Sequence, residues 1–83
     1  MRVTVRYFAS IREALDLGQE EVDTQAMTVS DLRDELMARS ERHAGALTRT
    51  KVVRIALNQV MTDESARLSD GCELAFFPPV TGG

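Results

Sequence analysis

The chain has 83 residues, 43% of them hydrophobic, and carries a net charge of −3. This length predicts one domain with a small core, and the apolar content excludes a disordered chain. The acidic balance and the dispersed Lys and Arg residues exclude nucleic acid as a partner, because neutralising phosphates needs a concentrated basic face. No apolar run is long enough to cross a bilayer.

The first part of the chain predicts a strand, a short helix and a weaker strand. Residues 2–8 alternate apolar and polar side chains, which is typical of a half-buried strand, and no signal pattern precedes them. Ser10 to Glu13 has the pattern of a capping box and predicts a short helix, which Gly18 ends in a left-handed conformation. Residues 20–23 predict the weaker strand, with its charged side chains in solvent.

The main helix is predicted to begin at Thr28, where Thr28 and Asp31 form a second capping pattern. The apolar stripe of this helix consists of Val29, Leu32, Leu36 and Met37. His43 is expected at the frayed end of the helix as an ordinary exposed residue, because it has no Cys or second His partner for metal binding or catalysis. Residues 44–51 are expected to form a polar connection.

The second half of the chain predicts three more strands. Residues 53–57 alternate, Asn58-Gln59 has the composition of a turn, and Val60-Met61 can pair briefly after it. Asp70-Gly71 is a turn signal before the final strand, residues 72–77. The side chains of that strand expected to face the core are Cys72, Leu74 and Phe76.

This order of elements is α+β. A mixed sheet curled around one main helix, with a short helix beside it, satisfies the order and is the ubiquitin-like β-grasp. The pattern alone leaves a ferredoxin-like sandwich as the alternative. Because Cys72 is the only cysteine, it cannot form an internal disulfide, which favours a reducing, cytoplasmic setting.

Ordinary catalytic constellations are missing from the sequence. It contains no Gly-rich phosphate loop and no Cys/His cluster with metal-ligand spacing, so we expect no metal site. The paired carboxylates Glu20-Glu21 and Asp63-Glu64 lie in polar stretches and are expected to be solvated. We therefore expect that the chain is not an enzyme on its own.

The last six residues, 78–83, are predicted to be an extended tail that follows a domain of residues 1–77. Pro78-Pro79 lacks the N–H groups of a sheet ladder and holds the chain extended, so that the tail reaches about 20 Å. Gly82-Gly83 has no Cβ atoms and is thin enough for a narrow tunnel. The α-carboxylate of Gly83, with an ordinary pKa of about 3.3–3.7, is a poor electrophile at neutral pH. Another protein must activate it, most simply as an acyl-adenylate made with ATP.

The ending Phe76-Phe77-Pro78-Pro79-Val80-Thr81-Gly82-Gly83 resembles the C-terminus of the molybdopterin synthase small subunits, a family of MoaD-type sulfur carriers with a β-grasp fold. A looser similarity covers the whole chain, through Tyr7-Phe8-Ala9 and the Asn58-Gln59 turn. Cys72 departs from the pattern, since a polar residue is expected there.

The resemblance implies a reaction at Gly83. An ATP-dependent activating enzyme would adenylate it, and a sulfur donor such as a cysteine desulfurase or a rhodanese-like protein would convert it to a thiocarboxylate. The tail would then enter the large synthase subunit, in a two-plus-two heterotetramer, and donate sulfur to cyclic pyranopterin monophosphate to build the dithiolene of molybdopterin. No tightly bound cofactor is implied. The tail residues that would enter are Pro78, Pro79, Val80, Thr81 and Gly82.

Two other functions remain open. One is a sulfur carrier for thiamine thiazole synthesis or tRNA thiolation. The other is a ubiquitin-like protein modifier, or a plain interaction domain, in which the diglycine forms amide bonds or has no role.

Three apolar residues are the candidates for a partner interface. Phe77 and Phe8 both point away from the core side of their strands, and the first and last strands of a β-grasp are neighbours. We therefore expect Phe8 and Phe77 to form an apolar patch at the root of the tail, joined by Met61. The alternative is that they fill a minor core under the loops. The resemblance favours docking.

Overall fold

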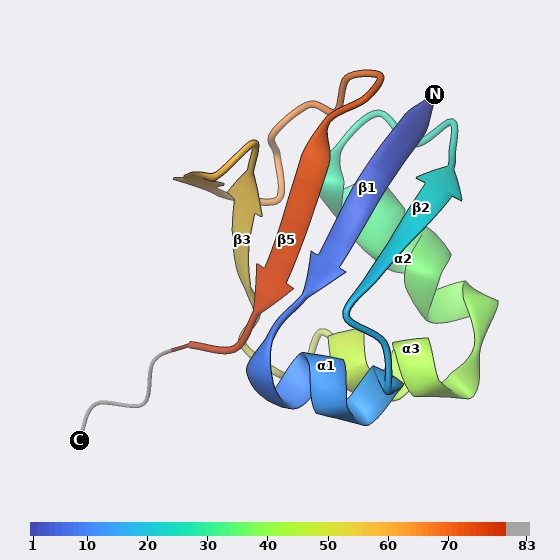
Figure 1. The fold of residues 1–83 in the computed structure, drawn as a ribbon, viewed down its shortest axis with the longest axis vertical. Helices are drawn as coiled ribbons and strands as arrows, with labels where there is room; N and C mark the ends of the chain where they lie inside the picture. The colour runs from blue at the N-terminus through green and yellow to red at the C-terminus, as the bar shows by residue number, and fades with distance from the viewer. Residues whose placement is uncertain (80–83) are drawn as a thin grey trace.

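The structure is a computed structural model that describes residues 1–79. Its strands form one five-stranded sheet in the order β2-β1-β5-β3-β4, with α2 behind it and α1 and α3 at its lower end (Figure 1). The strands are β1 (Arg2–Tyr7), β2 (Gln19–Asp23), β3 (Arg54–Leu57), β4 (Val60–Thr62) and β5 (Glu73–Phe77), and the helices are α1 (Ala9–Leu15), α2 (Val29–Arg39) and α3 (Glu41–Leu47).

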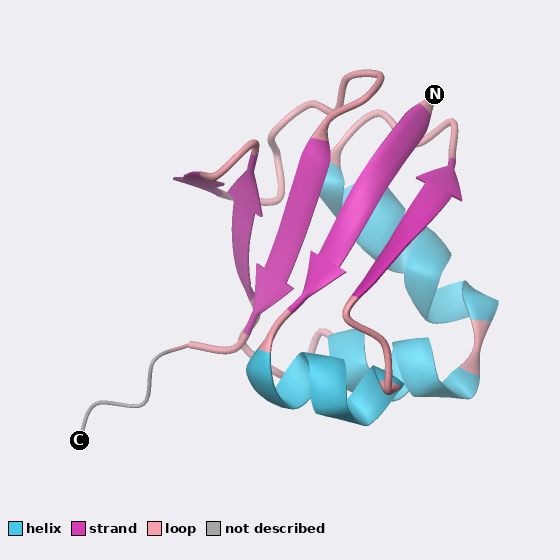
Figure 2. Ribbon diagram, viewed as in Figure 1, coloured by secondary structure: helices cyan, strands magenta, loops and turns pink. Residues whose placement is uncertain are grey.

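The sheet is mixed, as predicted. The central strands β1 and β5 run parallel, and the pairs β1–β2, β5–β3 and β3–β4 are antiparallel. The order of elements differs from the βαββαβ order of a ferredoxin-like sandwich, which is therefore excluded. In the described part of the chain, the front face of the sheet carries no helix (Figure 2), so side chains on that face are available for contacts outside the chain.

The core lies between the sheet and the helices. Alternate residues of β1 and one stripe of α2 are buried, so the period-two pattern of the first strand and the helical pattern are confirmed. In β3 and β5 the alternation is incomplete, because Ala56 and Ala75 are buried as well. Cys72 is also buried, as expected, and so is Leu68. The largest fully buried side chains are Tyr7, Phe76, Leu32, Leu36, Leu47, Leu74, Val3, Val5, Val22 and Val29.

The predicted ends of the short helix are wrong at both sides. The helix α1 begins at Ala9, and its N-cap is Phe8, which makes no side-chain cap hydrogen bond. The carbonyl oxygen of Phe8 accepts hydrogen bonds from the N–H groups of Ile11 and Arg12, so the start of the helix needs no serine cap. The left-handed residue that ends α1 is Asp16, with φ 53°, rather than Gly18.

The cap of the main helix is confirmed. The Thr28 hydroxyl oxygen accepts a hydrogen bond from the N–H of Asp31 at 3.2 Å. The Asn58-Gln59 turn is also confirmed: the two residues have φ values of 50° and 67°, the left-handed conformation that a tight hairpin between β3 and β4 requires. Gly71, with φ 82°, forms the predicted turn before β5.

The expectation of a polar connection over residues 44–51 is wrong in its first half, because α3 extends to Leu47 and buries Ala46 and Leu47. The buried guanidinium of Arg33 holds the segment that follows: it donates to the carbonyl oxygens of Leu47 at 2.8 Å and Thr48 at 2.9 Å. None of the helices within residues 1–79 is long and apolar enough to span a membrane.

Candidate functional site

The two aromatic residues expected at the root of the tail are in contact. The rings of Phe8 and Phe77 meet edge to face, with their centroids 6.4 Å apart and an interplanar angle of 85°. The backbone places them together, because the N–H of Phe8 donates to the carbonyl oxygen of Phe76 at 3.1 Å and so extends the parallel pairing of β1 and β5. Phe8 is 36% exposed and Phe77 is half-buried, so neither ring is part of the closed core.

A row of four residues crosses the front face beside these rings. Arg6 is paired with Ala75, Ala75 with Ala56, and Ala56 with Met61, on four neighbouring strands. The two alanines lie beneath a hollow of about 450 Å³, which we call the outer-face hollow; Phe8, Phe77, Arg6 and Glu73 also line it. Met61, 50% exposed, extends the apolar surface onto β4. Both alanines are only 8% exposed, and the sequence analysis missed them because small residues on the polar side of a strand carry no signal by themselves.

Two arginines lie beside the aromatic pair. The guanidinium carbon of Arg6 is 5.1 Å from the centroid of the Phe8 ring, and its Nη1 atom is 3.8 Å from Oε1 of Glu73. Arg54 is exposed and is the cross-strand partner of Phe77 on the same face of the sheet. Within residues 1–79, no carboxylate forms an ion pair with Arg54.

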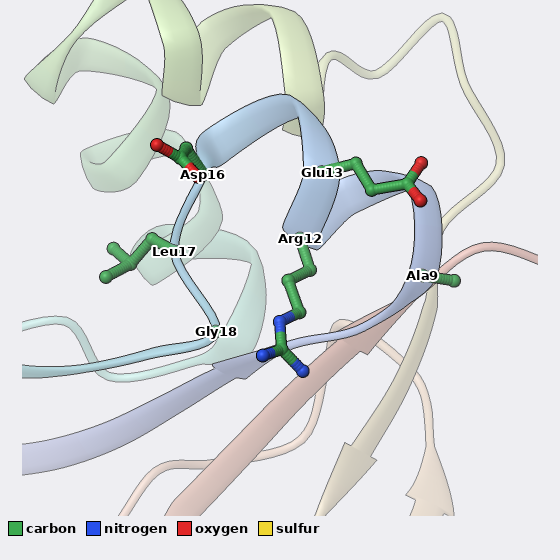
Figure 3. A pocket seen from close by; sticks show the side chains of 6 residues that line it. All are labelled: Ala9, Arg12, Glu13, Asp16, Leu17 and Gly18. Atoms are coloured by element: carbon green, nitrogen blue, oxygen red, sulfur yellow. The ribbon is translucent and has the colours of Figure 1, made fainter.

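A second hollow, of about 490 Å³, lies beside α1 and the loop that leads to β2 (Figure 3). Arg12 points from the helix toward Gly18, where a Cβ atom would lie 3.1 Å from its Nε atom; the glycine therefore makes room for the guanidinium. Glu13 and Asp16 also line this hollow. Within residues 1–79, no group of three or more His, Cys, Asp or Glu side chains is placed to hold a metal ion.

The structure corrects the expectations for His43 and Glu20. His43 is only 9% exposed, and its Nε2 atom lies 2.8 Å from Oε2 of Glu20. The Tyr7 hydroxyl donates to the same oxygen at 2.7 Å, and the Ser40 hydroxyl lies 2.7 Å from Nδ1 of His43. Glu20 is two residues from the buried Val22, so the alternation of β2 turns it toward the helices rather than into solvent.

This polar cluster shifts the pKa of two of its members. Burial alone would raise the pKa of Glu20, but hydrogen bonds from His43 and Tyr7, with the charges of His43 and Arg39, lower it below the ordinary value. Burial and the hydrogen bond to Glu20 raise the pKa of Tyr7. Every buried side-chain polar atom within residues 1–79 has a hydrogen-bond partner, so the cluster joins β1, β2 and α3 as part of the fold.

One family model, described as the ThiS family, matches residues 5–83 of the chain. The chain belongs to the ThiS family. The match runs through the diglycine at positions 82 and 83, and it confirms the family resemblance that the C-terminal run indicated.

Curated relatives in this family are similar over their full length. The chain is 42% identical to the molybdopterin synthase sulfur carrier subunit of Escherichia coli (strain K12), over 98% of this chain and 99% of that protein. It is 40% identical to the subunit of the same name from Mycobacterium tuberculosis (strain ATCC 25618 / H37Rv), over 100% and 99% of the two chains.

Solved structures confirm the ubiquitin-like β-grasp. SAMP1 from Haloferax volcanii superposes with a TM-score of 0.80 at 25% identity, over 100% of both chains. A chain of the complex of subunits 1 and 2 of molybdopterin-converting factor from Helicobacter pylori 26695 superposes with a TM-score of 0.68 at 30% identity, also over 100% of both.

The tail of this ThiS-family chain is only partly described. β5 ends at Phe77, and the half-buried Pro78 and Pro79 follow it. Val80, Thr81, Gly82 and Gly83 lie outside the described residues, so the division at residue 77 and the role of Gly83 stay predictions. Phe8 and Phe77 are in contact, and Met61 lies on the same face of the sheet, two strands away from β5. The role of these three residues in docking is likewise a prediction.

Proposed function

We propose that this chain is the sulfur carrier of molybdopterin synthesis. The single observation that carries the proposal is the full-length similarity to molybdopterin synthase sulfur carrier subunits, at 42% identity in the Escherichia coli protein. The aromatic pair Phe8–Phe77 supports it from the structure, since it presents an exposed apolar surface where the chain leaves the sheet toward Gly83.

The proposed chemistry takes place at the α-carboxylate of Gly83. A carboxylate oxygen attacks the α-phosphorus of ATP in the activating enzyme, pyrophosphate leaves, and an acyl-adenylate forms. A sulfide equivalent from the donor protein then attacks the acyl carbon of Gly83. A C–S bond forms, the bond from that carbon to the phosphate oxygen breaks, and AMP leaves. The thiocarboxylate sulfur is ionised at neutral pH and is the nucleophile that the carrier delivers to cyclic pyranopterin monophosphate.

The role of the chain in these steps is binding and positioning. The folded body docks through Phe8, Phe77 and Met61, and the residues from Pro78 to Gly82 carry the reacting end into the partner's active site. Docking converts an encounter between two solutes into a reaction within one complex, and this accounts for large gains in rate. The chain binds no cofactor tightly in this proposal, because the activating enzyme holds the ATP.

The proposed partners are three proteins in the cytoplasm. The large synthase subunit holds the pyranopterin that receives the sulfur, and the similarity to a chain from a complex of subunits 1 and 2 of molybdopterin-converting factor supports this pairing. The activating enzyme and the sulfur donor follow from the chemistry, because a free carboxylate needs ATP and a source of reduced sulfur.

The test is to charge the carrier in vitro. The full chain is incubated with the activating enzyme, ATP and a cysteine desulfurase or rhodanese-like donor, and intact-mass analysis is expected to show one oxygen replaced by sulfur. A variant lacking Gly83 is the control and should keep its mass. The charged carrier, mixed with the large subunit and cyclic pyranopterin monophosphate, should yield the dithiolene. An unchanged mass would contradict a carrier role, and charging without dithiolene formation would favour thiamine thiazole synthesis or tRNA thiolation.

A second candidate function is favoured by one structural neighbour. The solved SAMP1 structures from Haloferax volcanii include one described as small archaeal modifier protein 1, at a TM-score of 0.76 and 25% identity. A modifier would use the same adenylate at Gly83 and form an amide with a lysine of a target protein. The two functions separate in a cell extract supplied with ATP: a modifier yields covalent conjugates of higher mass, and a carrier does not.

A further inference from the structure

The two arginines beside the aromatic pair differ in what they contact. Arg6 already has two partners, the Phe8 ring at 5.1 Å and the Glu73 carboxylate at 3.8 Å. Arg54 is exposed, and no carboxylate within residues 1–79 forms an ion pair with it. In the free protein this difference has little cost, because water solvates the guanidinium of Arg54.

Docking changes the surroundings of Arg54. Arg54 and Phe77 are directly paired across β3 and β5, and side chains in such a pair lie about 4.5–5.5 Å apart at their Cβ atoms. A partner that covers the Phe77 ring therefore also removes water from the guanidinium of Arg54. A charge that loses its water without gaining a partner opposes binding. The covering surface must supply an acceptor, and a carboxylate matches the planar fork of an arginine best.

The rest of the front face makes this position distinctive. The net charge of the chain is −3, and the outward side chains of β2 include the acidic residues Glu21 and Asp23, two strands away from β5. Asp23 is paired with Arg2 at 3.3 Å, whereas Glu21 forms no ion pair within residues 1–79. A carboxylate on the partner would be repelled by Glu21 and attracted by Arg54, so one such group would select the orientation of the complex.

We propose that the large synthase subunit places a carboxylate against Arg54 while an apolar side chain of the same surface enters the outer-face hollow above Ala56 and Ala75. This inference rests on the proposed function for the identity of the partner. It adds to that function a specific charge pair, at an arginine that no motif of the sequence marks, and it makes Arg54 a specificity-determining residue.

The test compares three variants of the full chain in binding to the large subunit. Arg54→Glu reverses the charge, Arg54→Gln removes it, and Arg42→Glu makes the same reversal on the exposed surface of α3, away from the front face. At about 50 mM salt we expect Arg54→Glu to weaken binding by about tenfold or more, chiefly through slower association, and Arg54→Gln to lie between it and the unchanged chain. Arg42→Glu should stay within about twofold, since a distant exposed charge is largely screened.

Two further measurements complete the test. Raising the salt to about 300 mM should narrow the difference between the unchanged chain and Arg54→Glu, because salt screens the charge pair. Replacing carboxylates on the large subunit by lysine, one at a time, should identify one substitution that restores binding to Arg54→Glu. Thermal unfolding of each variant checks that the fold is kept.

The failure of this inference differs from the failure of the proposed function. If Phe77→Ala abolishes binding and Arg54→Glu binds like the unchanged chain, the docking surface stands and the charge pair is refuted. Equal weakening by Arg54→Glu and Arg42→Glu also refutes the pair, since the effect is then one of net charge. If Phe77→Ala binds normally, the docking surface itself is wrong.

Discussion

The Nε2 atom of His43 lies 2.8 Å from Oε2 of Glu20, a contact that joins α3 to the edge strand β2 across 23 positions of the sequence. The same oxygen accepts the hydrogen bond of the buried Tyr7 hydroxyl, and Tyr7 stacks on Phe76 with centroids 6.2 Å apart. The cluster therefore supports, from the core side, β5, which ends at Phe77, and β1, which Phe8 follows directly.

The first prediction concerns the stability of the protein in acid. The folded-state pKa of Glu20 is lowered from its ordinary value of 4.5, so the folded state favours the ionised carboxylate. The resulting stabilisation is complete above the unfolded pKa and is lost as the pH falls through the folded pKa. Urea unfolding should show a free energy of unfolding that falls as the pH drops below the ordinary Glu pKa of 4.5, and that falls less steeply in Glu20→Gln. The same slope in both proteins would contradict a role for the Glu20 charge.

The second prediction tests the burial of His43. Removing its ring in His43→Ala takes one hydrogen-bond partner from the Glu20 carboxylate and one from the Ser40 hydroxyl, and it opens a gap beside Tyr7. The free energy of unfolding should therefore fall by about 1–3 kcal/mol at neutral pH. The neighbouring exposed Arg42 provides the control, because Arg42→Ala should change stability by less than about 0.5 kcal/mol. Equal effects of the two substitutions would support the prediction from the sequence that His43 is exposed.

The third prediction separates docking from folding at Phe77. Because Phe77 is half-buried and contacts Phe8 at the surface, Phe77→Ala should weaken binding to the large subunit by about 2 kcal/mol or more. The loss of stability should stay below the 3–5 kcal/mol or so that truncating a core phenylalanine costs. Calorimetry of binding and thermal unfolding measure the two effects, and a collapsed fold would assign Phe77 to the core.

The fourth prediction addresses the outer-face hollow. Ala75 is only 8% exposed, but it lies on the front face and lines the hollow, so the larger side chain of Ala75→Leu should fill the space that a partner side chain needs. Binding to the large subunit should weaken by about tenfold or more, with the fold kept. Thr4→Leu is the matched control, because Thr4 lies on β1, on the same face of the sheet as Ala75, but does not line the hollow. Undiminished binding of Ala75→Leu would show that the hollow is not occupied in the complex.

The fifth prediction concerns the end of the chain. Deleting Gly83, or adding one residue after it, should abolish the formation of the thiocarboxylate, because the reacting carboxylate is displaced or replaced. Neither change should alter the thermal unfolding temperature, since both lie beyond β5, which ends at Phe77. Intact-mass analysis after charging gives the readout. Normal charging of the extended chain would show that the position of the carboxylate is not critical.

The sequence predicted some features of the site and missed others for a physical reason. The Phe8–Phe77 contact was predictable, because each residue follows the alternation of its own strand and the fold makes those strands neighbours. The burial of His43 was not, because α3 is short and carries a weak apolar pattern, and its position depends on Glu20 and Tyr7 from distant segments. The predicted start of α1 was wrong because the first hydrogen bonds of the helix go to the backbone carbonyl oxygen of Phe8. Every residue has such a carbonyl group, so the sequence does not mark this position.

The sequence by itself determined the strands with clear alternation, the apolar stripe and cap of α2, the two tight turns and the family to which the chain belongs. These features depend on the period of side chains along the backbone and on residues such as Gly71, whose conformation is a local property. Only the tertiary structure decided that His43 and Glu20 form a buried pair and that Arg54 lies beside Phe77. Burial and pairing between distant segments depend on which strands become neighbours in the sheet, and a local sequence pattern does not predict which strands those are.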